Sequence, residues 1–183
     1  MLRRADCRMA FDVTYVPAIL HNRPERIASA VKALIDAARG RYQRIFCAYG
    51  ACGTGGALDD LLRAEGIDRL PGAHCYEFIA GDAAFSALMA EEIGSFFLTD
   101  YLARHFDRLV WQGLGLDRYP GLRADYFGHY KRVVHLVQAP DQTTSDMAAR
   151  AARQLALPLK TIFTGLHELS SHIEAASLAR AHG

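Results

Sequence analysis

Residues 44–56, RIFCAYGACGTGG, join an apolar segment to a loop that contains four glycines. The nearly unbroken apolar run Arg44–Tyr49 is typical of a strand whose two faces are both covered by helices. Glycine tolerates positive φ and lets the backbone approach a ligand closely, so the loop is expected to have a defined shape. A buried strand followed at once by such a loop indicates an α/β protein with a site at this edge of the sheet.

The flanking sequence alternates between patterns typical of helices and strands. In residues 23–38, Pro24 suits the first turn of a helix, apolar residues recur at helical spacing, and Gly40 follows the end. A second helix is expected from Ala57, with Thr54 as its cap. Further strands are predicted at 11–16, 67–70, 108–111, 131–137 and 161–165, and further helices at 83–93, 97–106, 145–155 and 168–180.

This order predicts a single α/β domain over residues 1–183. Repeated strand-then-helix units pair their strands in parallel through right-handed crossovers. We therefore expect a three-layer α/β/α, Rossmann-like arrangement with a mostly parallel sheet of five or six strands. Residues 1–10 fit this order poorly and are expected to be either disordered or a truncated first unit.

The segment after residue 70 allows two interpretations. In the one we favour, Pro71-Gly72 turns the chain and a short helix begins near His74 and Cys75. In the other, a strand runs from Ala73 to Ile79 and places these two side chains on opposite faces.

Composition excludes several classes of partner. Lys and Arg number 21 against 20 Asp and Glu, a formal net charge of +1, so neither nucleic acid nor an anionic membrane is an expected partner. No apolar run approaches the roughly 18 residues of a membrane span, and no signal-peptide core follows the first residues, so a cytoplasmic location is expected. The four cysteines are then expected to be reduced.

Two thiols and an imidazole follow predicted turns at the carboxyl edge of the sheet. Cys52, His74 and Cys75 supply the soft sulfur and nitrogen donors that zinc or iron accepts, and they are the predicted metal ligands. A metal-free Cys52 thiolate and simple packing of small residues in a tight turn are the alternatives. Cys7 and Cys47 are left out of the site, because Cys7 lies near the terminus and Cys47 lies inside an apolar strand.

Other polar residues near these turns are candidates for chemistry. His21 and Glu77 are the predicted acid–base groups. The loop residues Gly53, Thr54 and Gly55 are predicted to bind substrate through backbone N–H groups, although the loop matches neither phosphate-binding glycine motif. Asp117 and Arg118 either orient a substrate carboxylate or pair with each other.

Three polar positions have simpler explanations. Asp100 and Arg104 are spaced as an intrahelical ion pair. His135 lies in a valine-rich strand and is expected to be a core histidine.

The apolar residues Phe96, Phe97 and Tyr101 are expected to form either core or the face of a homodimer.

Five motifs together resemble a bacterial branch of the family called domain of unknown function 1638. They cover most of the chain and are Leu20–Glu25, Tyr49–Gly56, Pro71–Glu77, Phe96–Asp100 and Gly113–Asp117. The resemblance implies that Cys52 and Cys75 belong to the site. Relatives often begin with a further strand that carries a cysteine-glycine turn, where this chain has Met1–Ala10, which implies a missing first unit or a misplaced start codon.

The resemblance also implies a metabolic setting. Such proteins tend to accompany corrinoid-dependent methyltransferase systems. The leading expectation is a thiolate-ligated zinc or iron protein that acts on a small molecule in methyl-transfer or one-carbon metabolism, with a corrinoid protein or methyltransferase as partner. Zinc keeps a bound thiolate available near neutral pH, which fits that chemistry. The alternatives are a non-catalytic module that binds or delivers a corrinoid or metal, and a metal-free enzyme with a cysteine nucleophile.

Overall fold

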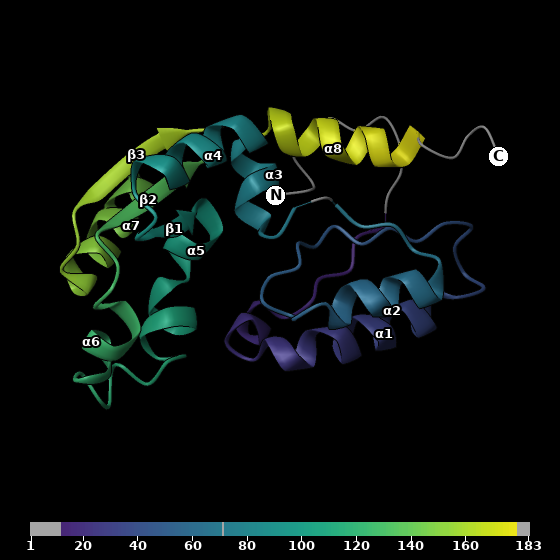
Figure 1. The fold of residues 1–183 in the computed structure, drawn as a ribbon, viewed down its shortest axis with the longest axis horizontal. Helices are drawn as coiled ribbons and strands as arrows, with labels where there is room; N and C mark the ends of the chain where they lie inside the picture. Colours follow the sequence, from purple (N-terminus) through teal and green to yellow (C-terminus); the bar gives the residue numbers. More distant parts are fainter. Residues whose placement is uncertain (1–11, 71, 179–183) are drawn as a thin grey trace. The chain divides into compact units, whose positions relative to one another are not determined.

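The computed structural model describes residues 12–70 and 72–178, drawn in colour in Figure 1. Cys7, Pro71 and the segment Met1–Ala10 therefore lie outside the described residues. The chain divides into two compact units, one formed by the residues up to Phe78 with those from His167 onward, and the other by Ile79–Leu166. We call them unit 1 and unit 2. A single domain over residues 1–183 stays a prediction.

Two amphipathic helices form the core of unit 1. After the short 3-10 segments η2 (Ala18–Asn22) and η3 (Pro24–Arg26), helix α1 runs over Ile27–Ala38, and helix α2 runs over Ala57–Glu65. The two helices lie side by side (Figure 1), and their apolar faces form one cluster of buried residues, Ile27, Val31, Ile35, Leu58 and Leu62. The predicted helices at these positions are confirmed. The cap of α2 is Gly56 rather than Thr54, whose hydroxyl donates to the Ala51 carbonyl at 2.8 Å.

Among the described residues of unit 1, strand pairing is limited to one bridge. Segments 44–49 and 67–70 run parallel and meet at Cys47 and Arg69, where the Cys47 N–H donates to the Asp68 carbonyl at 3.0 Å. Residues 12–16 form no strand, so the prediction of a strand there is wrong for the described part. Apolar, β-branched composition alone does not supply the neighbouring strand that a ladder needs. Helix α8 (His167–Leu178) is the last described element of this unit in the sequence.

Helix α3 (Cys75–Ala80) begins at the second site cysteine. The favoured short helix is thus confirmed and the strand over 73–79 is excluded. The Glu77 carboxylate accepts the Ala73 N–H at 2.8 Å, and the Glu77 N–H donates to the His74 carbonyl at 3.1 Å. These bonds satisfy backbone groups where the turn enters the helix.

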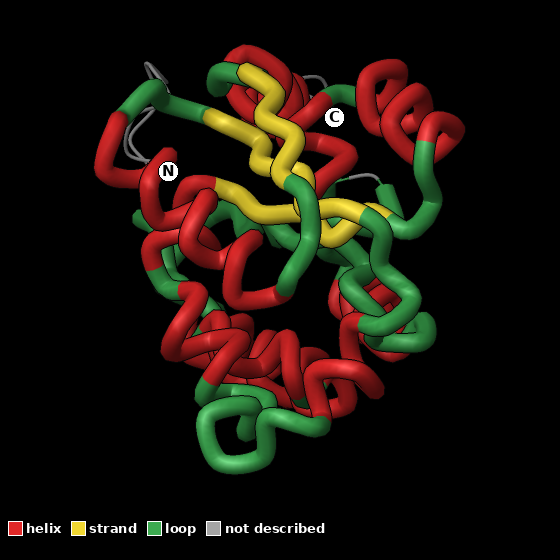
Figure 2. The backbone as a smooth tube through the Cα atoms, turned by 90° about the vertical axis from the view of Figure 1, so that its left-hand side faces the viewer, coloured by secondary structure: helices red, strands yellow, loops and turns green. Residues whose placement is uncertain are grey.

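Unit 2 contains a parallel three-stranded sheet, shown in yellow in Figure 2. Its strands are β1 (Ser95–Thr99), β2 (Arg132–Val137) and β3 (Leu159–Phe163), in the spatial order β1-β2-β3. In the register, His135 of the central strand lies between Leu98 and Thr161. Strand β2 is buried almost throughout, as its near-continuous apolar sequence predicts.

Helices pack around this sheet. They are α4 (Asp82–Glu91), α5 (Asp100–Arg104), the π-helical segment η4 (Asp107–Trp111), α6 (Leu122–Phe127) and α7 (Gln142–Leu155). The Asp141 carboxylate caps α7 by accepting the Thr144 N–H at 2.9 Å. Helix α7 contacts β2, β3 and α5, and its small residues enter the main core. None of the described helices combines the length and apolar character needed to cross a membrane.

The α/β class with parallel pairing is confirmed, whereas the finer arrangement is not. The described residues contain three strands rather than the expected five or six. The predicted strand at 108–111 is wrong, because these residues belong to η4, and the predicted helix at 97–106 begins as strand β1. Short apolar runs fit a buried helix turn and a buried strand equally well, so periodicity did not separate them.

Leu98 offers a test of this core. It is a fully buried residue of β1, so Leu98→Ala is expected to lower the free energy of unfolding by about 2–5 kcal/mol through lost apolar contact and a cavity. Ile93, just before the strand, is 79% exposed, and Ile93→Ala is expected to change stability by less than about 0.5 kcal/mol. Urea unfolding of both variants makes the comparison, and equal losses would contradict the core described here.

Candidate functional site

The glycine loop of unit 1 holds Cys52 in a strained conformation. Its φ of +43° lies in the left-handed region that residues other than glycine rarely adopt, and Gly53 follows with φ of +76°. The Cys52 N–H donates to the Ala73 carbonyl at 3.0 Å, while the Thr54 N–H donates to the Ala51 carbonyl at 3.0 Å. These bonds fix the loop internally and tie it to the segment before α3. Non-glycine residues held at such angles occur preferentially at functional sites.

Gly50 allows the loop to lie directly against the start of α3. A Cβ atom at this position would lie 2.9 Å from the Cys75 backbone nitrogen and 3.0 Å from the His74 carbonyl carbon. It would also lie 3.3 Å from the Cys52 sulfur. Only glycine fits such an approach without movement of the backbone. The two cysteines are therefore brought together by backbone packing.

His21 reaches the same place from η2. Its side chain hydrogen-bonds Cys52, and its Nδ1 lies 3.0 Å from the Ala18 carbonyl. The Tyr49 hydroxyl lies 3.3 Å from Nε2, and the two rings stack with centroids 5.5 Å apart. Because the Ala18 carbonyl can only accept a hydrogen bond, the neighbouring Nδ1 carries a proton. A thiol, an imidazole and a group that orients the imidazole form the usual arrangement for activating a cysteine.

The electrostatics favour a Cys52 thiolate. The hydrogen bond from the Cys75 thiol, followed by the bond from His21, lowers the pKa of Cys52 to about 4, although burial opposes the shift. The same thiolate raises the pKa of His21 above its ordinary value. Its negative charge and the burial of Cys75 hold the pKa of the Cys75 thiol well above the ordinary range. These directions favour a thiolate at Cys52 beside a protonated His21 and a protonated Cys75 thiol.

Cys47 lies nearby in the sequence but has a different environment. Burial raises the pKa of its thiol to about 11, so it stays protonated near neutral pH and is expected to be unreactive. Leaving it out of the site agrees with this environment.

The structure places the other predicted site residues as follows. Gly53, Thr54 and Gly55 lie in the same loop as Cys52, with Gly55 also at positive φ. Glu77 accepts the Ala73 N–H, and His74 is exposed in the turn before α3. Asp117 and Arg118 are exposed residues of unit 2, between η4 and α6. Acid–base and substrate-binding roles for these residues stay predictions.

The predicted metal ligands form an incomplete set. Cys52 and Cys75 are together and provide two soft donors. Over residues 12–70 and 72–178, however, no three His, Cys, Asp or Glu side chains are grouped to surround one cation. The imidazole bonded to Cys52 belongs to His21, not to the predicted ligand His74.

Unit 2 holds a buried polar cluster where β1 and β2 end. The Asp100 carboxylate accepts Nε2–H of His135 at 3.1 Å and the N–H groups of Gln138 and Ala139 at 3.1 and 2.9 Å. The core position of His135 is confirmed, and burial lowers its pKa. Asp100 thus pairs with His135 rather than with Arg104, which contacts Asp141 at 3.7 Å instead.

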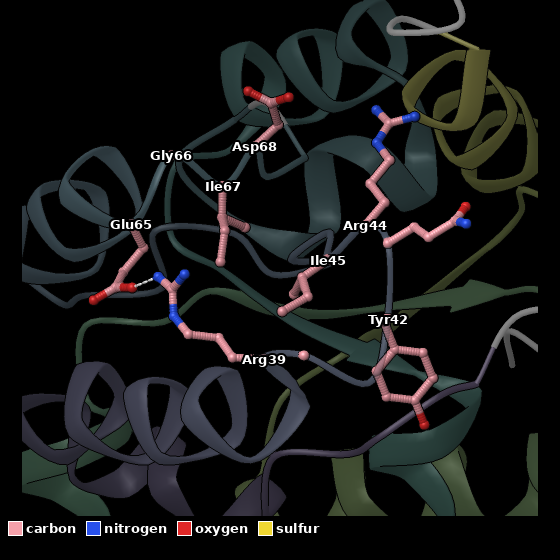
Figure 3. A pocket seen from close by; sticks show the side chains of 10 residues that line it. Arg39, Tyr42, Arg44, Ile45, Glu65, Gly66, Ile67 and Asp68 are labelled. Atoms are coloured by element: carbon pink, nitrogen blue, oxygen red, sulfur yellow. Dashed lines mark hydrogen bonds and ion pairs between the residues drawn. The ribbon is translucent and has the colours of Figure 1, made fainter.

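Unit 1 also has a cavity of about 450 Å³ away from the cysteines (Figure 3). It lies between the end of α1 and the end of α2, and its lining includes Arg39, Tyr42 and Glu65. Arg39 and Glu65 form an ion pair across it, as Figure 3 shows. Ligand pockets are mostly apolar with a few converging polar groups, whereas four of the ten residues that line this hollow are charged. We therefore place the candidate site at Cys52.

Replacement of Gly50 tests the close approach. Gly50→Ala is expected to cost about 1–3 kcal/mol of stability, because its Cβ has no room beside the Cys75 backbone. It is also expected to slow alkylation of Cys52 at acidic pH, since the bond from Cys75 would be displaced. Gly121→Ala is the matched control, because a Cβ there meets nothing within 4 Å. Unfolding curves and alkylation rates that are unchanged in Gly50→Ala would contradict this geometry.

Comparison with known proteins gives one match. The family model described as "Protein of unknown function (DUF1638)" matches residues 15–173, a span that includes His21, Cys52 and Cys75. No curated protein and no solved structure matches the chain. The resemblance inferred from the five sequence motifs is thereby confirmed, and the chain belongs to the DUF1638 family.

Proposed function

We propose that Cys52 is the nucleophile of an enzyme that acts on a small electrophilic molecule, with His21 as its acid–base partner. The observation that carries this proposal is the convergence of His21 and Cys75 on the Cys52 sulfur, which lowers its pKa to about 4. Cys52 is half-buried and His21 is exposed, so the pair can be reached from solvent. A reactive thiolate requires this combination of stabilising donors and access.

The chemistry follows from the positions of the protons. The Cys52 thiolate attacks an electrophilic centre, a bond to sulfur forms, and the bond to the leaving group breaks. The imidazolium of His21 then donates its proton to the leaving group, and the Ala18 carbonyl keeps the ring oriented. The backbone N–H groups of the loop around Gly53, Thr54 and Gly55 are the proposed contacts for the substrate.

A methyl-transfer or one-carbon substrate, with a corrinoid protein or methyltransferase as partner, stays a prediction. So does a non-catalytic role in binding or delivering a corrinoid or a metal. The thiolate site supports a covalent step more directly than a delivery role, because a carrier site has no need of the imidazolium beside Cys52.

The pH dependence of alkylation tests the thiolate. Ordinary thiols have a pKa of about 8.5, so their rate constants fall tenfold per pH unit below that value. The rate constant of Cys52 with iodoacetamide is expected to stay level down to about pH 5, since its pKa is lowered to about 4. Low-pKa thiolates are intrinsically weaker nucleophiles, so the shape of the profile decides, not the absolute rate. The Cys47→Ser variant is the control and should give the same profile.

Replacement of His21 tests the pair. His21→Gln removes the imidazolium, so the pKa of Cys52 is expected to rise and the level part of the profile to begin at a higher pH. His74→Gln, at an exposed position in the adjacent turn, should leave the profile unchanged. Mass spectrometry of the alkylated peptide assigns the rate to Cys52. A shift in His74→Gln but not in His21→Gln would contradict the proposed partner.

Metal binding is the second candidate function. The adjacent sulfurs of Cys52 and Cys75 favour it, because thiolates are the preferred soft ligands of zinc and iron. A third ligand would have to come from His21 or His74 after a rearrangement. In this reading both cysteines bind the metal as thiolates, and His21 keeps a proton for transfer where His74 is the third ligand.

Elemental analysis distinguishes the two candidates. Protein purified without an affinity tag is expected to carry near-stoichiometric zinc or iron if metal binding is the function, and Cys52→Ser and Cys75→Ser should both lose it. Cys47→Ser should keep it, since burial holds that thiol protonated. Wild-type protein that stays empty after anaerobic reconstitution would contradict the metal candidate and leave the cysteine nucleophile.

A further inference from the structure

We propose that Cys75 is a resolving thiol, which closes a reversible disulfide with Cys52 after a hydroperoxide has oxidised the Cys52 sulfur. This inference rests on the proposed Cys52 thiolate and adds both a substrate class and a role for the second cysteine. It makes the site a two-cysteine redox centre that is complete within unit 1.

The first argument is proximity. The Cys52 sulfur accepts hydrogen bonds from both the Cys75 thiol and the Cys75 backbone N–H. The Cys52 N–H is itself bonded to the Ala73 carbonyl at 3.0 Å, and Gly50 leaves no side chain between the two segments. Both cysteines are free thiols, so the pair is present in its reduced state. Disulfide formation requires backbones this close, and side chains already in contact need little movement.

The second argument is the location of the two cysteines. Cys52 lies in the glycine loop and Cys75 is the first residue of α3, and both residues are partly exposed. An oxidant can therefore reach the pair, and a bond between the two sulfurs requires no helix or strand to unwind.

The reaction balances with groups that the site holds. The thiolate attacks the terminal oxygen of the hydroperoxide, an S–O bond forms, the O–O bond breaks, and the alkoxide takes the proton of His21 to leave as an alcohol. Cys52 loses two electrons in this step.

In the second step, Cys75 passes its proton to the neutral His21, and the Cys75 sulfur attacks the Cys52 sulfur. The S–S bond forms, the S–O bond breaks, and hydroxide leaves as water with the proton from His21. An external dithiol restores both thiols by exchange.

The test exposes the full chain to an equimolar amount of hydrogen peroxide and measures intact mass and peptide links. We expect wild-type protein to lose two hydrogen atoms, to yield a peptide in which Cys52 is bonded to Cys75, and to regain its mass with dithiothreitol. Cys75→Ser should instead gain one oxygen atom at Cys52 and be trapped by dimedone. Cys75→Ala is a second variant with the same expectation, and circular dichroism checks that both are folded. Cys47→Ser should behave as wild type.

Two results would overturn the inference. One is a wild-type Cys52 that shows the level alkylation profile yet accumulates the dimedone adduct without a bond to Cys75, and in that case the proposed nucleophile stands. The other is a disulfide from Cys52 to a different cysteine. If Cys52 reacts with neither peroxide nor iodoacetamide at acidic pH, the proposed function and this inference fail together.

Discussion

The site depends on the contact between the backbone of the glycine loop and the backbone at the start of α3. Gly50 lies so close to Cys75 that a single added carbon would overlap the backbone nitrogen. A backbone hydrogen bond between the two segments, from the Cys52 N–H to the Ala73 carbonyl, supports this approach. Because the contact is made by backbone atoms, the main chain fixes where the two cysteine side chains begin, and a single rotatable bond then places each sulfur. Preorganisation of this kind lets a thiolate be stabilised without a large rearrangement.

Local sequence patterns predict most of the described helices correctly but fewer of the described strands. Pro24 near the start of α1 has a fixed φ that marks a boundary, and it appears where expected. Gly66 ends α2 in a left-handed conformation that glycine readily adopts. A strand is different because it exists only when another strand lies beside it. The apolar run 44–49 meets its neighbour at one bridge, and Leu109 and Val110 bury their side chains from a helical turn instead. No local pattern contains that information.

The sequence predicts that Cys52 and Cys75 belong to one site, but it predicts only some of the residues that contact them. Cys52 and Cys75 were marked by adjacent turns, which are local features. His74 was the predicted imidazole because it precedes Cys75 in the sequence, whereas the structure brings His21 to Cys52 from a segment that precedes α1. Tyr49, which stacks on His21, was missed because nothing in its own neighbourhood signals that contact. In unit 2, the Asp100–His135 pair joins groups 35 residues apart, while the spacing of Asp100 and Arg104 suggested a local pair.

In the proposed mechanism, the thiolate of Cys52 and the protonated His21 together carry no net charge. A neutral substrate would therefore bind beside two opposite charges that balance each other. A strongly charged substrate would instead place an uncompensated charge beside half-buried groups. Once the sulfur has formed a covalent bond, the anion that held the proton on the imidazole is gone, and the pKa of His21 falls back toward its ordinary value. Covalent modification of Cys52 is thereby linked to the protonation of His21. The free and the modified protein therefore differ in the number of protons that they take up from solution.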